Sequence, residues 1–373
     1  MIEGKPQAYW SDPFPASNPL IPVVGKALGR YTNLGGAVAT DVEQFRPNVN
    51  DRFNVTLQRE LVQKLVIDAT YFGNIGRDLP YTRQFNLMDP QLGYTHKTLL
   101  NQRVNNPFFN YLTPDKFPGQ LRNQAQVALS ELLKPYPQYS SISQTNTPGV
   151  REHYHSFQMK VQRPFANGFN FLLAYNYNRE YQEEFFNDLE EFANKFRYEP
   201  AQRGRHRLTM ASVYEFPFGK SRRYLAHAPK VVDLIAGGWN ASGIYSYNAG
   251  TLLRFGALDM VGDPHLDSPS KWGAMFNSKA FAVLPAFTVR TNPKTIPGIL
   301  GPGFKNLDLT LGKFFALTER YRLELRMEAY NVSNTFNAAD PSTSISSANF
   351  GRVSQQAPAY YGREFQYNLK LHF

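Results

Sequence analysis

The 373-residue sequence contains no cysteine. A disulfide scaffold, thiol catalysis and cysteine-ligated metal sites are therefore excluded. No stretch reaches 18 consecutive apolar residues, which excludes a transmembrane helix. The first residues lack the basic and apolar regions of a signal peptide, so we expect that any export signal was removed or precedes residue 1.

The motifs of the common enzyme classes are also missing. There is no Gly-x-Ser-x-Gly elbow and no credible Ser/His/Asp set, and the glycines of residues 298–303 are not followed by the Lys-Ser or Lys-Thr of a phosphate loop. We therefore expect no enzymatic activity and no cofactor.

Two groups of residues are weak candidates for a metal site. The first is an i, i+2 histidine pair and the second is a set of aspartates spaced every four residues: His153 and His155; Asp259, Asp263 and Asp267. No third ligand accompanies the histidines, and the aspartate spacing does not fit an EF-type calcium loop. We favour polar residues at a rim and in a loop, and expect no resident metal.

Tryptophan is scarce, with 3 residues, but phenylalanine and tyrosine reach 29 and 22. The mean hydropathy is nevertheless −0.44. Such a chain fits a sheet with one lipid face and one wet face, with rings where lipid meets water. A soluble β-rich protein with long polar loops fits equally well, so composition alone does not choose.

The net charge of +10 comes from basic residues dispersed along the chain, with the tightest clusters at residues 203–207 and 220–223. Each cluster could contact nucleic acid or anionic lipid. We favour a solvated or interfacial role for both, and expect no nucleic-acid partner.

Apolar residues recur at every second position in many segments. In residues 321–329, Tyr, Leu, Leu, Met and Ala alternate with Arg322, Glu324, Arg326 and Glu328. Successive side chains on a strand point to opposite faces, so each such segment has one apolar and one polar face. The segments that carry this pattern, or a weaker copy of it, lie within residues 53–58, 65–71, 157–162, 169–177, 207–216, 239–247, 307–311, 321–329 and 365–373.

The connections between these nine expected strands alternate in length. Short ones lie near residues 60–64, 164–168 and 317–320, and long ones cover residues 74–152, 179–204, 248–303 and 333–363. Membrane barrels have short periplasmic turns and long outer loops. Residues 217–238 should be a short turn and are not, which predicts an enlarged periplasmic element. We expect helices at residues 124–134 and 181–194, and one more strand near residues 31–40.

The four alternating charges Arg322, Glu324, Arg326 and Glu328 cannot face hydrocarbon, where each Arg or Lys at the midplane costs about 2–4 kcal/mol. We expect them to face the lumen of a barrel. They could contact a plug or a ligand there, although we favour an ion-pair ladder with neighbouring strands.

The last residues form an alternating apolar set that ends in a terminal aromatic: Phe365, Tyr367, Leu369, Leu371 and Phe373. This ending resembles the C-terminal assembly signal that the barrel-assembly machinery recognises in bacterial outer-membrane barrels.

Several stretches, in order, resemble the barrel region of TonB-dependent receptors of the Oar-like, acidobacterial type. They read NDRFNV (50–55), QREL (58–61), LLKPYPQY (132–139), YHSFQ (154–158), YEFPFGK (214–220), GGW (237–239), LTER (317–320) and EAYN (328–331). The resemblance covers about residues 15–373. It implies active import of a scarce, bulky ligand such as a siderophore or glycan through a plugged barrel of about 22 strands.

The sequence therefore predicts an all-β fold: about nine or ten strands of an antiparallel transmembrane β-barrel in the Gram-negative outer membrane. We expect a loop-rich segment in residues 1–50 and the barrel portion in residues 51–373. Neither a plug nor a TonB box is present, so we expect a fragment whose partners are membrane lipid, the remaining strands and, through the absent plug, TonB. The alternative is a secreted, carbohydrate-binding β-sandwich or propeller.

Overall fold

The computed structural model describes residues 11–15, 27–186, 195–201, 203–318, 320–358, 360 and 362–373. The chain forms two compact units. One comprises residues 1–40, 84–89 and 98–143, and the other comprises residues 41–83, 90–97 and 144–373.

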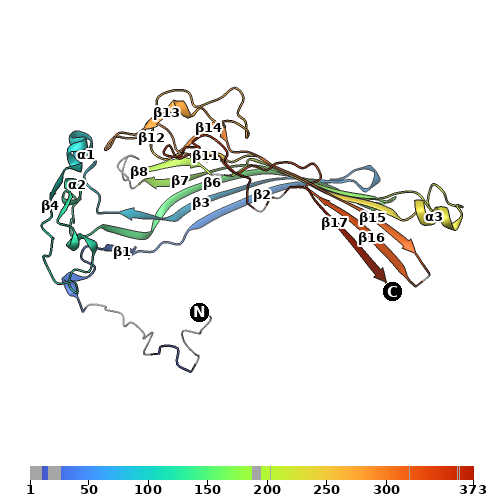
Figure 1. Cartoon of the computed structure of the whole chain (residues 1–373), viewed down its shortest axis with the longest axis horizontal. Helices are drawn as coiled ribbons and strands as arrows, with labels where there is room; N and C mark the ends of the chain where they lie inside the picture. The colour runs from blue at the N-terminus through green and yellow to red at the C-terminus, as the bar shows by residue number, and fades with distance from the viewer. Residues whose placement is uncertain are drawn as a thin grey trace. The chain divides into compact units, whose positions relative to one another are not determined.

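The second unit is built on one large sheet (Figure 1). Its main path contains nine strands that lie side by side in their sequence order, and the pair β2–β3 and all pairs from β6 to β17 are antiparallel. They are β2 (Val49–Glu60), β3 (Val66–Gln84), β6 (Ser141–Ala166), β7 (Phe169–Phe186), β9 (His206–Glu215), β10 (Trp239–Asn248), β15 (Phe304–Ala316), β16 (Arg322–Tyr330) and β17 (Glu364–His372). Two further strands join it off this path: β1 (Ala37–Asp41) pairs with β6, and β8 (Lys195–Pro200) pairs with β7. Each of the nine expected strands is confirmed.

Short and long connections alternate, as expected. In an up-and-down sheet this places all short connections at one end. The β6–β7 turn is the pair Asn167 and Gly168, both with positive φ (54° and 78°), which matches the twist of a two-residue hairpin. The enlarged element of residues 217–238 contains the helix α3 (Lys230–Ala236), which lies at the end of the sheet away from β11–β14 (Figure 1).

Three strands are longer than a membrane requires. A crossing needs about 9–11 residues, whereas β3, β6 and β7 have 19, 26 and 18. The connections expected at residues 74–152 and 179–204 are therefore shorter than predicted, because β3, β6 and β7 extend into them. The helix expected at residues 181–194 is wrong over 181–186, which belong to β7, and 187–194 lie outside the described residues.

The first unit has little regular structure. Its elements include η1 (Gly29–Tyr31), η4 (Gln120–Asn123), β4 (Arg103–Asn105), β5 (Gln126–Ala128) and α2 (Leu129–Leu132). The helix expected at residues 124–134 is thus reduced to α2, preceded by a strand. The strand expected near residues 31–40 is shorter and begins at Ala37.

Hydrogen bonds from a side-chain amide connect distant segments of the first unit. The Asn86 amide donates to the carbonyls of Tyr136 and Tyr139, both at 2.9 Å. Phe117 is fully buried and lies so close to Gly35, whose φ is +74°, that a Cβ there would come within 2.8 Å of the ring. Glycine is therefore required at that contact.

A small hydrophobic core lies in the β10–β15 connection. This connection contains β11 (Leu252–Arg254), β12 (Leu258–Met260), β13 (Phe281–Val283) and β14 (Thr295–Leu300), which pair as β11 with β14 and β12 with β13. We call residues 252–300 the loop cap. Its buried cluster is Leu253, Phe255, Leu258, Phe276, Ala280, Phe281, Ile296 and Ile299. Ile345 and Phe350 of the β16–β17 connection pack against this cluster.

The large sheet has no such core on its apolar face. That face comprises the even-numbered residues of β9 and the odd-numbered residues of its neighbours, which lie opposite one another in register, such as Tyr214, Ala241, Leu311 and Met327. Many of these side chains are exposed, among them Leu57, Leu309, Leu369 and Phe365. No helix among the described residues is long and apolar enough to cross a membrane.

Aromatic rings mark two levels of the apolar face. Phe169, Tyr214 and Trp239 lie toward the short connections, and Tyr175 and Tyr245 lie toward the long ones. Trp239 and Tyr245 are six residues apart on β10, or about 20 Å along the strand. The positions between are mostly apolar, with Phe171, Leu173 and Met210 beside the small residues Ala241, Gly243 and Ser212. This is the pattern of an apolar band between two interfaces.

Candidate functional site on the polar face of the sheet

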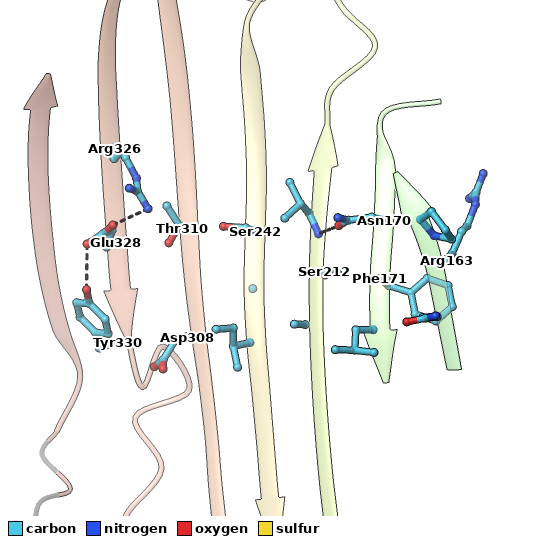
Figure 2. Close-up of a pocket in the computed structure, with 17 residues that line it drawn as sticks. Arg163, Asn170, Phe171, Ser212, Ser242, Asp308, Thr310, Arg326, Glu328 and Tyr330 are labelled. Carbon is cyan, nitrogen blue, oxygen red and sulfur yellow. Dashed lines mark hydrogen bonds and ion pairs between the residues drawn. The ribbon is translucent and has the colours of Figure 1, made fainter. Parts of the chain in front are cut away.

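The opposite, polar face of the sheet contains a hollow of about 790 Å³ that extends across strands β6 to β16 (Figure 2). Residues of neighbouring strands meet there in register: Asn170 faces Val213, Ser242 faces Val213 and Thr310, and Thr310 faces Glu328. The wall therefore carries amide, hydroxyl and carboxylate groups, with a few aliphatic side chains such as Leu172 and Ile244. Such a surface can hydrogen-bond water or a polar solute.

A chain of charged groups crosses one side of the hollow. Arg326 Nη2 lies 3.0 Å from Glu328 Oε1, and Arg326 Nε lies 3.9 Å from Glu324 Oε1. The Tyr330 hydroxyl donates to Glu328 at 2.9 Å (Figure 2), and His372 Nε2 lies 2.9 Å from Glu324. The two carboxylates are mostly covered, whereas the Arg326 side chain keeps 46% of its surface exposed. The guanidinium is therefore held in place and still accessible.

A further carboxylate on this wall, Asp308 of β15, is hydrogen-bonded to the neighbouring backbone. Its oxygens accept the Asn331 amide N–H at 2.8 Å and the Asn306 side-chain amide at 2.9 Å. This contact fixes the point at which β16 ends and the long connection begins.

The structure joins three of the four residues singled out from the sequence. Glu324, Arg326 and Glu328 form one network, but Arg322 makes no ion pair with any described residue and lines a separate hollow near Lys220 and Lys230. The expected ladder between strands is corrected in one respect. The ion pairs of Arg326 run along β16 at i and i+2, and β17 contributes His372 and the Asn368 amide.

Sequence reasoning missed Asp308, Tyr330, Asn170 and Ser242 at the hollow. Their parity on the strands places them on the polar face, but nothing in the sequence distinguishes them from other polar positions. Only the strand register brings them together.

The five C-terminal apolar residues all lie on one side of β17, and Phe373 follows the strand directly. They are exposed, from 49% for Leu371 to 87% for Phe373. Among the described residues β17 pairs with β16 alone. The assembly role expected for these residues stays a prediction.

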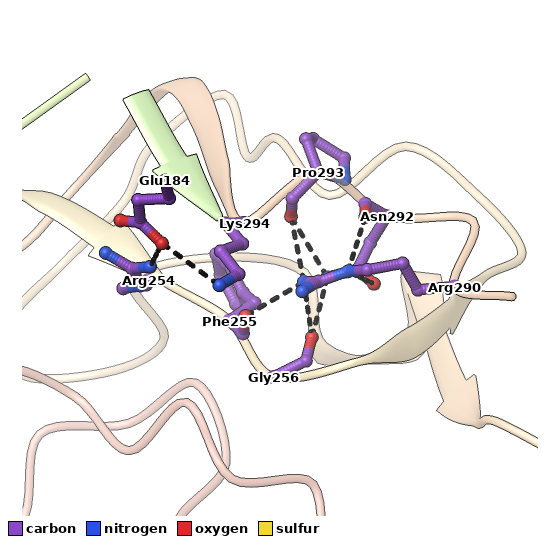
Figure 3. A network of polar contacts seen from close by, with 8 residues as sticks. All are labelled: Glu184, Arg254, Phe255, Gly256, Arg290, Asn292, Pro293 and Lys294. Carbon is purple, nitrogen blue, oxygen red and sulfur yellow. Dashed lines mark hydrogen bonds and ion pairs between the residues drawn. The ribbon is translucent and has the colours of Figure 1, made fainter. Parts of the chain in front are cut away.

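A polar clamp ties the loop cap to the extended end of β7 (Figure 3). Glu184 of β7 accepts from Arg254 and, at 3.1 Å, from Lys294. Arg290 is buried and donates to the backbone carbonyls of Phe255 and Gly256. Burial alone raises the pKa of Glu184, but the hydrogen bonds and charges of Arg254 and Lys294 outweigh it and hold the pKa below its ordinary value.

The weak metal candidates contact other groups. His155 is hydrogen-bonded to Tyr71 at 2.9 Å, and His153 lies 3.5 Å from the Tyr198 hydroxyl. Asp263 pairs with His265 at 2.7 Å. The described part of the chain contains no group of three or more His, Asp or Glu side chains that could hold a metal ion.

The up-and-down topology, the exposed apolar face and the polar hollow all have the form of a membrane barrel wall. The model of the outer membrane beta barrel domain family matches residues 3–366. The chain belongs to this family. It therefore resides in the outer membrane, which argues against the alternative of a secreted, carbohydrate-binding β-sandwich or propeller.

The chain is also similar to a solved structure, the outer membrane transporter YddB from Escherichia coli. The identity is 12% and the TM-score 0.45, and the match covers 91% of this chain but 34% of that structure. The chain thus spans about a third of the length of that transporter. No curated protein matches the sequence.

Proposed function

We propose that this chain forms part of the wall of a TonB-dependent transporter that imports a bulky, scarce ligand such as a siderophore or glycan. The observation that carries the proposal is the hollow on the polar face, whose wall includes the charged groups of Arg326, Glu328 and Asp308. A plug domain or a polar ligand would find hydrogen-bond partners there.

The two edges of the sheet support a wider barrel. Among the described residues, the outermost strands β2 and β17 of the main path each pair with one neighbour. Unpaired backbone groups in lipid cost several kcal/mol each. Further strands therefore pair with β2 and β17, and the complete barrel is wide enough to hold a plug that couples to TonB.

The resemblance to Oar-like receptors supports active import over passive diffusion. It includes the segments NDRFNV at residues 50–55, in β2, and YEFPFGK at residues 214–220, at the end of β9.

Conductance and uptake measured on the full-length protein test the proposal. A plugged transporter inserted into a planar bilayer should be silent, since the plug fills the lumen. Cells that carry the protein should accumulate a ferric siderophore, cobalamin or maltodextrin probe faster than cells without it, and a protonophore should abolish the difference. A stable open conductance, or uptake that survives the protonophore, would contradict active transport.

We further propose that Phe365, Tyr367, Leu369, Leu371 and Phe373 present the last strand to the barrel-assembly machinery. Their exposure on one edge strand supports this role. Phe373→Ser should lower the amount of folded protein in the outer membrane several-fold, while the polar-side change His372→Ser should lower it less. Equal yields from both variants would exclude a specific signal.

A further inference from the structure

The β9–β10 connection, residues 216–238, presents an apolar helix face that nothing in the described chain covers. Within helix α3, Val231, Val232, Leu234 and Ile235 are 69%, 40%, 41% and 68% exposed. At 100° per residue these four side chains share one side of the helix, and Asp233 lies on the opposite side. Tyr224 and Leu225, earlier in the same connection, are also exposed.

The helix is held firmly in this orientation. The Asp233 carboxylate accepts a hydrogen bond from the backbone N–H of Lys220 at 2.6 Å. The backbone carbonyl of Asp233 accepts the N–H of Gly237 at 2.8 Å. The aliphatic face is therefore displayed by a fixed scaffold.

The last turn of the helix is fastened to the lipid-facing side of the sheet. The Trp239 indole N–H donates to the Ile235 carbonyl at 2.9 Å, and the Lys313 ammonium donates to the Gly237 carbonyl. Trp239 and Lys313 lie opposite each other in register on the apolar face, and the ammonium lies 5.5 Å from the Trp239 ring centre. The apolar surface of α3 is thus continuous with the surface that meets lipid.

The same connection is strongly basic. Residues 217–238 contain Lys220, Arg222, Arg223 and Lys230 against a single acid, Asp233, whose carboxylate already binds backbone. Arg222 pairs with Glu215 at 2.9 Å, whereas Lys220, Arg223 and Lys230 form no ion pair with any described residue and are exposed. Excess cations beside an aliphatic helix face are the composition of an element that lies in a membrane interface.

We propose that the β9–β10 connection is a membrane anchor that inserts α3 into the periplasmic leaflet of the outer membrane and binds anionic phospholipid headgroups through Lys220, Arg223 and Lys230. It lies at the end of the sheet with the short connections, which in such barrels is the periplasmic end. Continuity with the lipid-facing surface and charge complementarity favour lipid over a periplasmic protein as the occupant.

Single-cysteine labelling tests the insertion directly, because the chain has no cysteine of its own. The full-length protein carrying Ile235→Cys or Val231→Cys is labelled with an environment-sensitive fluorophore in vesicles of equal parts phosphatidylglycerol and phosphatidylcholine. Quenchers attached to lipid acyl chains should quench both labels, and aqueous iodide should not. The control Ala348→Cys, exposed in the β16–β17 connection, should show the reverse. Labels at both helix positions that respond to iodide alone would show a surface directed at water or at a protein, and would overturn the proposal.

A second measurement tests the headgroup contact. Spin-labelled phosphatidylglycerol should be immobilised by the protein in preference to phosphatidylcholine, and the triple variant Lys220→Gln, Arg223→Gln, Lys230→Gln should reduce that preference several-fold. The matched variant Lys97→Gln, Lys116→Gln, Lys279→Gln removes the same charge from exposed positions in other connections and should leave the preference unchanged. An unchanged preference in the first variant, or an equal loss in both, would contradict a specific anionic-lipid contact.

Discussion

The large sheet and the loop cap place their hydrophobic residues in opposite ways. Leu369 on the sheet is 68% exposed, whereas Phe276 in the cap is fully buried. The sheet is solvated by lipid on its apolar face and needs no second layer of protein. The cap belongs to a long connection, the kind of segment that lies outside the bilayer in membrane barrels, and there its apolar residues cover one another. Apolar residues of this chain are therefore exposed where they meet lipid and buried where they meet water, and we take the membrane surface as the boundary between the two regions.

The largest effect that separates the two regions should come from the core of the cap. Phe276→Ala removes a ring that stacks edge-on against Phe255, Phe281 and Phe350. The resulting cavity should destabilise the cap by about 3–5 kcal/mol. Hydrogen exchange of residues 252–300 should accelerate accordingly, while exchange in the strands of the sheet stays unchanged.

The control for this prediction is Val283→Ala in the same cap, since Val283 is 72% exposed. Its effect should stay within about 0.5 kcal/mol. If both variants opened the cap equally, the buried cluster would not be its stabilising element.

A somewhat smaller effect should come from a charge on the lipid face. Leu309→Arg places a guanidinium among the outward-facing aliphatic residues of β15, at about 2–4 kcal/mol near the midplane. The fraction of folded protein in the outer membrane, measured by the shift of unheated samples on a gel, should fall sharply.

The neighbouring change Thr310→Arg is the matched control, because Thr310 faces the polar hollow. It should leave assembly nearly unchanged. A reversed order of the two variants would mean that the faces have been assigned the wrong way round.

The smallest of the three effects concerns the clamp between cap and sheet. Glu184→Gln removes the charge that binds Arg254 and Lys294, and should weaken protection of the cap by about 1–2 kcal/mol. The folded-state pKa of Glu184 lies below its ordinary 4.5, so its contribution is present above that value and is lost as the pH falls through the folded pKa. The difference between wild type and variant, measured by proteolysis of the cap, should therefore vanish on acidification. A difference that persisted in acid would exclude this charge as its source.

The exposed pair Arg77 and Asp51 serves as a control for the clamp: Asp51→Asn should change stability by less than about 1 kcal/mol.

The same boundary explains what could be predicted from the sequence. Within the membrane, one face of each strand meets lipid and the other meets water, so the alternation that reveals Phe169, Phe171, Leu173 and Tyr175 is enforced. Beyond the membrane both faces are wet and the alternation ends. Residues 181–186, with Glu183 and Glu184, were therefore predicted as part of a helix although they continue β7.

The loop cap and the hollow could not be found for related reasons. Phe255 and Phe276 lie in irregular segments, and Ile296 lies in the six-residue strand β14. Their contacts are distant in sequence, so no period marks them. On the polar face, the alternation placed Glu324, Arg326 and Glu328 on one side of the strand, and the structure joins them by ion pairs. The positions of their partner His372 and of the neighbouring Asp308 follow from the strand register. The register could not be read from a single sequence.

Accessibility of spin labels along β15 tests the central claim most directly, namely that the apolar face of the sheet, odd-numbered on this strand, is solvated by lipid. Single cysteines are introduced one at a time at residues 306–311 of the full-length protein in phospholipid vesicles. Labels at 307, 309 and 311 should collide with oxygen, which concentrates in the bilayer, and labels at 306, 308 and 310 should collide with a water-soluble nickel complex, giving a period of two with opposite phase. Odd positions shielded from both reagents would reveal a second protein layer against this face and contradict the account.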